Sequence, residues 1–308
     1  MTEPLVSADS PRASVPPASP WLRLLTLGEV TLWTLLIPAA RMGYKCLTPD
    51  GAVWAATRHM GFGVIAVAAS VCLFLAWHKQ DFNACGITLQ DWPGNLKIGV
   101  VLSLLCAGVV VASVPIFRRA GINHFTGWEA QGRILALCFA LPALALLVWI
   151  FRVAQAIAKR LPTTLGIALY LGLWATPLML AWHFNRPWDV TLIAFLGSVI
   201  VAGPGEEIIF RGYIQSRLNA VFGRPFCLGG MQFGWGWPIT AFLFGIVHIF
   251  NGFDPIHGHY DLQWTWGLGG FISGLMLGYL REKTGSVLSG AIFHGNNDAW
   301  VLILQNLR

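Results

Sequence analysis

The stretch Gly203–Gly212 carries two adjacent carboxylates, Glu206 and Glu207, directly after an apolar segment. An ionisable residue at the centre of a membrane helix costs about 2.5–3.5 kcal/mol even on the lenient insertion scale, so two together predict a function. Arg211 lies four residues after Glu207, which places both on one helix face where they can pair. Glu206 projects about 100° away, without that partner. We therefore expect Glu207 and Arg211 to form a structural ion pair and Glu206 to be the catalytic carboxylate.

Two histidines occur in later apolar segments, each with a neighbour on its own helix face. His248 follows Phe244 by four residues, and His294 precedes Asp298 by four residues, with Asn297 beside that pair. Residues at this spacing share a face of a helix. Any one of these polar groups is also typical of helix–helix hydrogen bonding in a membrane. Because the ionisable set is spread over three segments, it predicts one polar site where these segments meet.

The residue types favour hydrolysis by an activated water. A buried carboxylate such as Glu206 suits the role of general base. The two histidines can supply hydrogen bonds, a second proton carrier or a cation for a developing oxyanion. The chain has no G-x-S-x-G motif and no Gly-rich phosphate loop after a strand. We expect the target to be a bond within or beside the bilayer, with amide hydrolysis the most natural reaction.

Composition places these residues in a membrane protein. The 308 residues are 56% hydrophobic and 11% charged, whereas a soluble domain has about 25% charged residues. The net charge of +6 comes from cations between apolar segments, as the positive-inside rule requires, so we expect no nucleic-acid partner. The six cysteines show no C-x-x-C and no metal-ligand spacing, which argues against cysteine chemistry.

The elements that position the site are predicted to be membrane helices, about nine in number, because a span needs roughly 20 residues. The apolar segments lie at about 24–40, 61–77, 98–117, 134–151, 163–182, 190–208, 238–250, 264–280 and 287–304. Glu29 within the first segment argues against a cleaved signal peptide. The sequence thus predicts an all-α, polytopic helix bundle and a multi-pass protein of the cell membrane.

Three other segments have compositions of their own. Residues 1–20, with five prolines, are expected to be a disordered tail. Residues 214–222 alternate polar and apolar side chains at helical spacing, which predicts a short helix on the membrane surface, ended by Gly223. The Gly- and aromatic-rich segment 226–237 is predicted to be a mobile loop that guards substrate entry.

In its spaced motifs the chain resembles the CPBP family of CAAX-processing and bacteriocin-processing intramembrane proteases, which includes the type II CAAX prenyl endopeptidases. The motifs are Glu206-Glu207-x-x-x-Arg211, Phe244-x-x-x-His248, and His294 with a polar residue four positions later. The resemblance is specific over residues 190–304. It implies a core of eight helices within a CPBP-like domain at 85–308, with N-terminal membrane helices at 21–84.

The resemblance also implies roles for the site residues. Glu206 activates the water with the assistance of His248. His294 and the residue at position 298 position the water or stabilise the oxyanion. Glu207 and Arg211 are structural or position the substrate.

This chain departs from the family's usual pattern at one end of the site. The family commonly has Asn where this chain has Asp298, and a carboxyl group donates a hydrogen bond only when protonated. Either Asp298 orients His294, or Asn297 takes the donor role. The His294-Gly295 step is also unusual.

Zinc is the alternative to a metal-free site. Glu206, His248 and His294 together form a possible zinc-ligand set with an open coordination position. However, the chain has no H-E-x-x-H motif, and a water activated by a glutamate needs no ion. We expect no cofactor, with Zn²⁺ as the alternative.

The predicted function is that of an intramembrane endopeptidase acting on a protein or peptide presented at the lipid bilayer. One alternative is a proton-coupled membrane transporter, because buried Glu and His also form proton relays. The first half of the chain is nearly bare of the polar groups that such a pathway needs. The other alternative is a non-catalytic bacteriocin-immunity or protein-sorting membrane factor.

Overall fold

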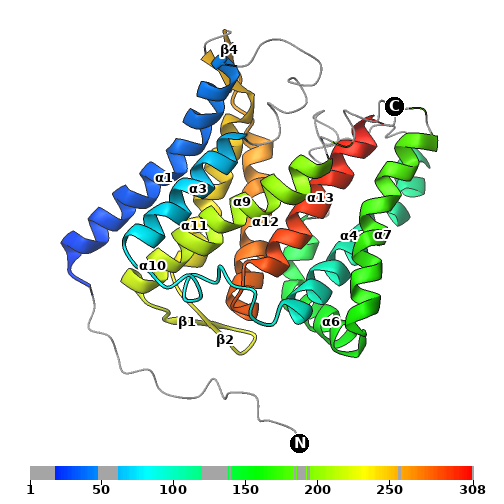
Figure 1. Ribbon diagram of the computed structural model, residues 1–308, viewed down its shortest axis with the longest axis horizontal. Helices are drawn as coiled ribbons and strands as arrows, with labels where there is room; N and C mark the ends of the chain where they lie inside the picture. Colours follow the sequence, from blue (N-terminus) through cyan, green and yellow to red (C-terminus); the bar gives the residue numbers. More distant parts are fainter. Residues whose placement is uncertain are drawn as a thin grey trace, which may run out of the picture.

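The computed structural model is a bundle of helices with two small β-hairpins (Figure 1). It describes residues 18–47, 62–119, 138, 140–183, 185, 192, 195–255 and 258–306. The described chain is mostly helical, in agreement with the predicted all-α class. Most of the predicted tail at 1–20 lies outside the described residues.

Most helices of the first half follow the predicted apolar segments, but the helix that ends at Arg160 begins at Leu147, close to the end of the predicted segment 134–151. They are α1 Pro20–Leu47, α3 Phe62–Trp77, α4 Trp92–Arg119, α6 Leu147–Arg160 and α7 Thr163–His183. Within the described residues, three helices are long and apolar enough to cross a membrane, at Pro20–Tyr44, Trp92–Val109 and Thr163–His183. The count of about nine spans stays a prediction.

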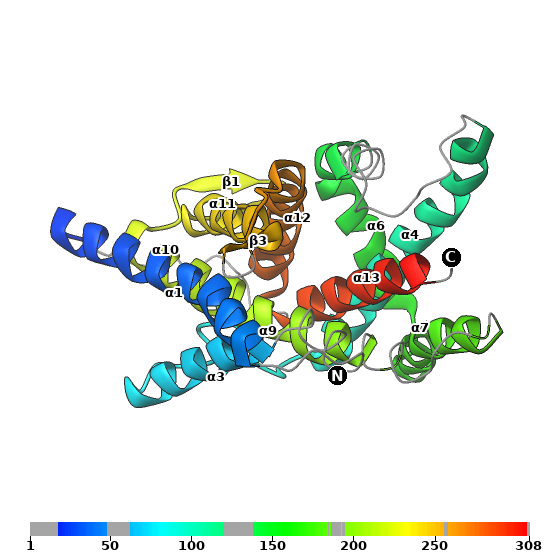
Figure 2. The ribbon, with the colours of Figure 1, turned by 90° about the horizontal axis from the view of Figure 1, so that it is seen from above.

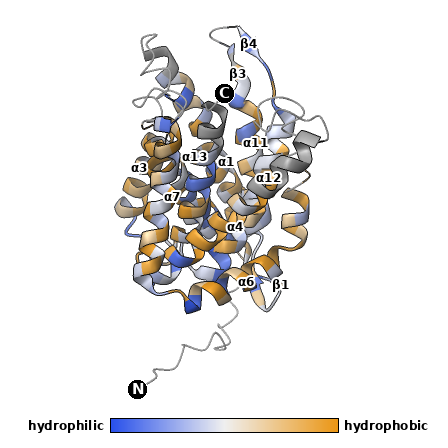
Figure 3. Cartoon of the chain, turned by 90° about the vertical axis from the view of Figure 1, so that its right-hand side faces the viewer, coloured by the Kyte–Doolittle hydropathy of each residue, from blue (hydrophilic) through white to orange (hydrophobic). Residues whose placement is uncertain are grey.

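Apolar side chains cover much of the outside of the bundle. Leu73 on α3, Trp149 on α6 and Met179 on α7 are 71%, 62% and 65% exposed, and hydrophobic residues run along most described helices in Figure 3. Trp77 and Trp182 are also strongly exposed, and each lies at a helix end. Such a surface suits contact with lipid, with tryptophans at the membrane–water interfaces.

The carboxylate pair lies in the middle of one long helix, here called the central helix. It consists of four consecutive segments: η1 Gly197–Ala202, α9 Gly203–Glu207, η2 Ile208–Ile214 and α10 Gln215–Phe222. Both η1 and η2 have π-helical turns. The predicted segment 190–208 ends one residue after Glu207, whereas the helix continues for fifteen residues beyond Glu207 to Phe222.

The prediction for 214–222 is confirmed at its end, but the segment is not a short helix of its own. Gly223 ends the helix with φ +78°, a conformation that favours glycine. However, α10 directly continues η2, and Leu218 is fully buried with Gln215 and Asn219 beside it. Its polar and apolar faces pack inside the protein, so α10 is not a separate surface helix.

The remaining elements complete the second half of the chain. They are β1 Phe226–Leu228, β2 Met231–Phe233, α11 Gly236–Ile249, η3 Phe250–Gly252, β3 Phe253–Asp254, β4 His259–Tyr260, α12 Trp264–Thr284 and α13 Leu288–Asn306. The predicted loop at 226–237 contains an antiparallel hairpin, in which Leu228 pairs with Met231. Its turn residues Gly229 and Gly230 have φ +58° and +77°, so the glycines there form a tight turn.

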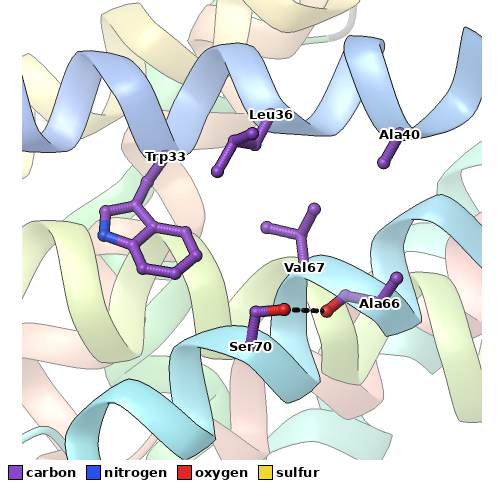
Figure 4. Close-up of a pocket in the computed structure, with 6 residues that line it drawn as sticks. All are labelled: Trp33, Leu36, Ala40, Ala66, Val67 and Ser70. Atoms are coloured by element: carbon purple, nitrogen blue, oxygen red, sulfur yellow. Dashed lines mark hydrogen bonds between the residues drawn. The ribbon is translucent and has the colours of Figure 1, made fainter.

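The N-terminal helices share a core with the central helix. Val30 of α1 and Val71 of α3 are fully buried in the same cluster as Ile209 and Phe244. Where α1 and α3 diverge they enclose a hollow of about 230 Å³ (Figure 4). It is lined by Trp33, Leu36, Ala40, Ala66, Val67 and Ser70. None of these is a predicted site residue, and the division at 84/85 stays a prediction.

Candidate active site

Glu207 and Arg211 form a buried ion pair, as the sequence predicts. Arg211 Nη1 lies 2.8 Å from Glu207 Oε1, and the side chains are 0% and 1% exposed. Arg211 Nη2 also donates to the carbonyl of Gly274 on α12 at 3.4 Å. The guanidinium carbon lies 4.2 Å from the centre of the Phe244 ring, within cation–π range. The pair thus joins the central helix to α11 and α12.

His294 lies at the centre of the three carboxylates. Its Nδ1 is 3.1 Å from Glu207 Oε1, where a carboxylate accepts and the ring nitrogen donates. Its Nε2 faces Asp298 Oδ2 at 3.5 Å and Glu206 Oε2 at 3.8 Å. The sequence predicts the neighbour at position 298, but not the contact with Glu207. That contact holds the ring by Nδ1 and turns Nε2 towards Glu206.

Glu206 is the more exposed carboxylate of the pair and makes the weaker contact with His294. Its side chain is 18% exposed, against 1% for Glu207. Oε2 of Glu206 has no hydrogen-bond partner among the described residues. The 3.8 Å to His294 is longer than a direct hydrogen bond, and a water that contacts both atoms can bridge such a distance. Glu206 is therefore placed to hold a water against His294.

His248 and His294 both pack against the Phe244 ring. The Phe244 ring centroid is 4.4 Å from that of His248 and 5.8 Å from that of His294. His248 Nδ1 is 2.7 Å from the Phe244 carbonyl, which can only accept, so Nδ1 donates and Nε2 is left for another ligand. Trp266 stacks beside the His248 ring with 6.5 Å between centroids. The predicted shared face of Phe244 and His248 is confirmed.

The polar residue that reaches His294 from its own helix is Asp298. Its side chain is 46% exposed, so Asp298 faces both the histidine and open space. Asn297, the predicted alternative, is half-buried, and its role as the donor stays a prediction. The neighbouring Asn296 is buried and donates from Nδ2 to Ser103 Oγ on α4 at 3.5 Å. Position 298 therefore meets His294 directly, and the carboxylate is the group present there.

Two glycines let α13 approach the central helix. A Cβ added at Gly203 meets the Gly295 N and Cα at 2.7 Å, and one added at Gly295 meets the Ser198 carbonyl at 2.9 Å. Any side chain at these positions forces the two backbones apart. The unusual His294-Gly295 step thus has a packing reason. Gly203 and Gly295 were not predicted as site residues; small residues at helix contacts are the signal that finds them.

Figure 2 shows α9 between α3 and α13, and both of these helices contact α9. The π-helical segments η1 and η2 flank α9 on either side. Segments of this kind are frequent at functional sites, because the wider turn redirects the side chains that follow. Glu206 and Glu207 therefore lie on a short α-helical stretch between two irregular ones.

The described residues do not assemble a metal site. Within them, no three His, Cys, Asp or Glu side chains are grouped so that they can hold an ion. Of the alternative zinc set, Glu206 and His294 approach each other to 3.8 Å, and His248 binds the Phe244 carbonyl through Nδ1, which leaves its Nε2 free. The residues present do not fit a three-ligand zinc site in this arrangement.

The segment that carries the site matches one known protein family. The family model described as type II CAAX prenyl endopeptidase Rce1-like matches residues 187–300. Residues 187–300 form an Rce1-like domain. This is a protease family of membrane proteins, as the motifs at 190–304 predict. The Rce1-like domain contains all eight predicted site residues, together with Gly203 and Gly295. Neither a curated protein nor a solved structure matches the chain.

Proposed function

We propose that the chain is an intramembrane endopeptidase that hydrolyses a peptide bond of a protein or peptide presented at the lipid bilayer. The observation that carries this proposal is the approach of Glu206 to His294 Nε2, with 3.8 Å between them and an unpartnered carboxylate oxygen. Neighbouring Glu207 is 1% exposed and binds both Arg211 and His294 through Oε1, although its Oε2 also has no hydrogen-bond partner among the described residues. Glu206 is thus available to activate a water, while Glu207 orients His294.

In the proposed reaction Glu206 takes a proton from the water, and the water oxygen attacks the carbonyl carbon of the substrate. In this proposal His294 and Asp298 hold the water beside Glu206. His248, which packs against the Phe244 ring, assists through its free Nε2. When the C–N bond breaks, Glu206 returns the proton to the leaving amine. Arg211 neutralises Glu207, which keeps His294 in place.

The proposed substrate is of the CAAX type, because the Rce1-like family model carries that description. We propose further that the enzyme is a multi-pass protein of the cell membrane and that the water needs no metal ion. The apolar outer surface and the three candidate spans support the first point. The second is supported by the described residues, in which no three His, Cys, Asp or Glu side chains are grouped so that they can hold an ion.

The test is cleavage of peptides by the full chain reconstituted in lipid vesicles. Peptides ending in Cys-aliphatic-aliphatic-X, with and without a prenyl group, are compared by mass spectrometry of their products. Glu206→Gln is expected to lower turnover by at least about 10³-fold, because the general base is lost, while the amount of folded protein is unchanged. The wild-type assay is repeated with a zinc chelator, and no change is expected. Cleavage that survives Glu206→Gln disproves the proposal, and loss with the chelator disproves its metal-free form.

A further inference from the structure

Glu29 is a carboxylate within the apolar helix α1, outside both the Rce1-like domain and the site described above. An ionisable residue in such a helix is costly and is normally paired. Here it binds two residues of the central helix. The Tyr213 hydroxyl donates to one carboxylate oxygen, and Arg217 donates to the other from Nε and Nη2, at 3.2 Å each.

The Tyr213 ring is held between the two N-terminal helices. Its centroid lies 5.9 Å from Trp33 of α1 and 5.7 Å from Phe74 of α3, both edge-to-face. The residue is 3% exposed. Because both neighbours pack against the ring, its hydroxyl is directed at Glu29 and has little freedom to turn away.

Another face of the same helix is held by α12. Arg211 donates to the Gly274 carbonyl at 3.4 Å, and one turn later Gln215 donates to the Gly278 carbonyl at 3.2 Å. Residues 211 and 215 share one face of the helix, whereas 213 and 217 share a different one. The central helix is therefore bound on two faces, by α12 on one and by α1 on the other.

The contacts with α1 and with α12 together restrict the rotation of the central helix about its axis. Glu206 and Glu207 come immediately before η2, the π-helical segment that contains both Arg211 and Tyr213. A rotation at η2 swings Glu206 relative to His294 on α13. A misplacement of about 1 Å at a catalytic group can lower the rate about 10²-fold. Loss of the contacts between α1 and the central helix is therefore expected to lower turnover.

We infer that Glu29, through Tyr213 and Arg217, is a positioning residue that sets the rotation of the central helix and so the direction of Glu206. The inference rests on the proposed function. It makes α1, which precedes the Rce1-like domain, part of the working enzyme.

The experiment is a double-mutant cycle in the full chain with Glu29→Gln and Tyr213→Phe, measuring kcat, KM and melting temperature. Each single variant is expected to lower kcat about tenfold with KM nearly unchanged, because no substrate contact is lost. The double variant is expected to match the more strongly affected single variant, since both changes act on the one hydrogen bond between Tyr213 and Glu29: Glu29→Gln weakens it by removing the charge, and Tyr213→Phe removes it. Tyr279→Phe is the matched control, because the buried Tyr279 hydroxyl has no partner among the described residues. Its kcat is expected to equal that of the wild type.

Three results overturn the inference. The first is a wild-type kcat in Glu29→Gln, even if the melting temperature falls. The second is losses in kcat that multiply in the double variant. The third is an equal loss in the Tyr279→Phe control. Glu206→Gln in the same assay separates this inference from the proposed function. If Glu206→Gln still cleaves, or the wild type cleaves nothing, both fail; if Glu206→Gln is inactive while the Glu29 and Tyr213 variants turn over normally, only the inference fails.

Discussion

Glu206 and Glu207 are adjacent in the chain but have different surroundings. Glu207 is 1% exposed and binds Arg211 and His294 through Oε1, whereas Glu206 is 18% exposed and lies 3.8 Å from His294, too far for a direct hydrogen bond. Successive helical residues point about 100° apart, so Glu207 reaches both Arg211 and His294, whereas Glu206 lies beside His294 without binding Arg211. This divergence separates a structural carboxylate from one that is available for chemistry.

The two carboxylates are therefore expected to differ in their effect on stability. Glu207→Gln leaves the guanidinium of Arg211 buried without its counter-charge, which costs about 3–5 kcal/mol. Glu206→Gln removes no ion pair with Arg211 and is expected to change the free energy of unfolding by less than about 1 kcal/mol. The measurement is denaturant unfolding of both variants in detergent. Equal destabilisation of the two variants contradicts this assignment.

At the scale of elements, the close crossing of α9 and α13 brings the carboxylates to His294. The crossing depends on Gly203 and Gly295, whose backbones leave no room for a Cβ. The approach is of the kind that small residues permit between membrane helices. The catalytic distances thus depend on positions that carry no functional group.

Gly203→Ala is expected to destabilise the protein by about 1–3 kcal/mol, because the added methyl group meets backbone atoms that must shift. It is also expected to lower turnover by about 10²-fold as Glu206 moves away from His294. The readouts are the unfolding free energy and kcat. Gly172→Ala on α7 is the matched control, since a Cβ there meets nothing within 4 Å. A normal kcat in Gly203→Ala shows that the crossing distance is not critical.

At the scale of the whole molecule, one buried carboxylate joins segments that are far apart in the chain. Glu282 near the end of α12 is 1% exposed. It accepts hydrogen bonds from Gln215 at 2.8 Å and from Asn219 at 2.6 Å, and it pairs with Arg224 at 2.8 Å. Asn219 in turn accepts from the Gly236 amide at the start of α11. The far end of the central helix is thereby tied to α11 and α12.

Glu282→Ala is expected to cost about 2–5 kcal/mol, since two amide side chains lose their acceptor inside the protein. The pair with Arg224 contributes little to this loss, because Arg224 is 38% exposed and its charge is screened by solvent. Thermal unfolding measures the change, and Asp261→Asn on the exposed segment before α12 is the control. An unchanged melting temperature in Glu282→Ala shows that these contacts do not hold the helices together.

The sequence by itself determined the helical class, the motif-bearing domain and the contacts within single helices. The pairing of Glu207 with Arg211 and of His294 with Asp298 follows from a spacing of four residues, because helix geometry alone brings such positions together. Phe244 and His248 meet for the same reason. None of these contacts depends on how the helices pack.

Only the tertiary structure decided the contacts between helices. Glu207 meets His294, Gly203 meets Gly295 and Glu29 meets Tyr213 because of how far each helix is rotated and where it crosses its neighbour. The rotation and crossing position of each helix are set by packing over the whole bundle, so a local sequence pattern does not determine them. The continuation of the central helix through η2 into α10 was missed for a related reason: polar residues at 215 and 219 resemble a surface face until α12 supplies their buried partners.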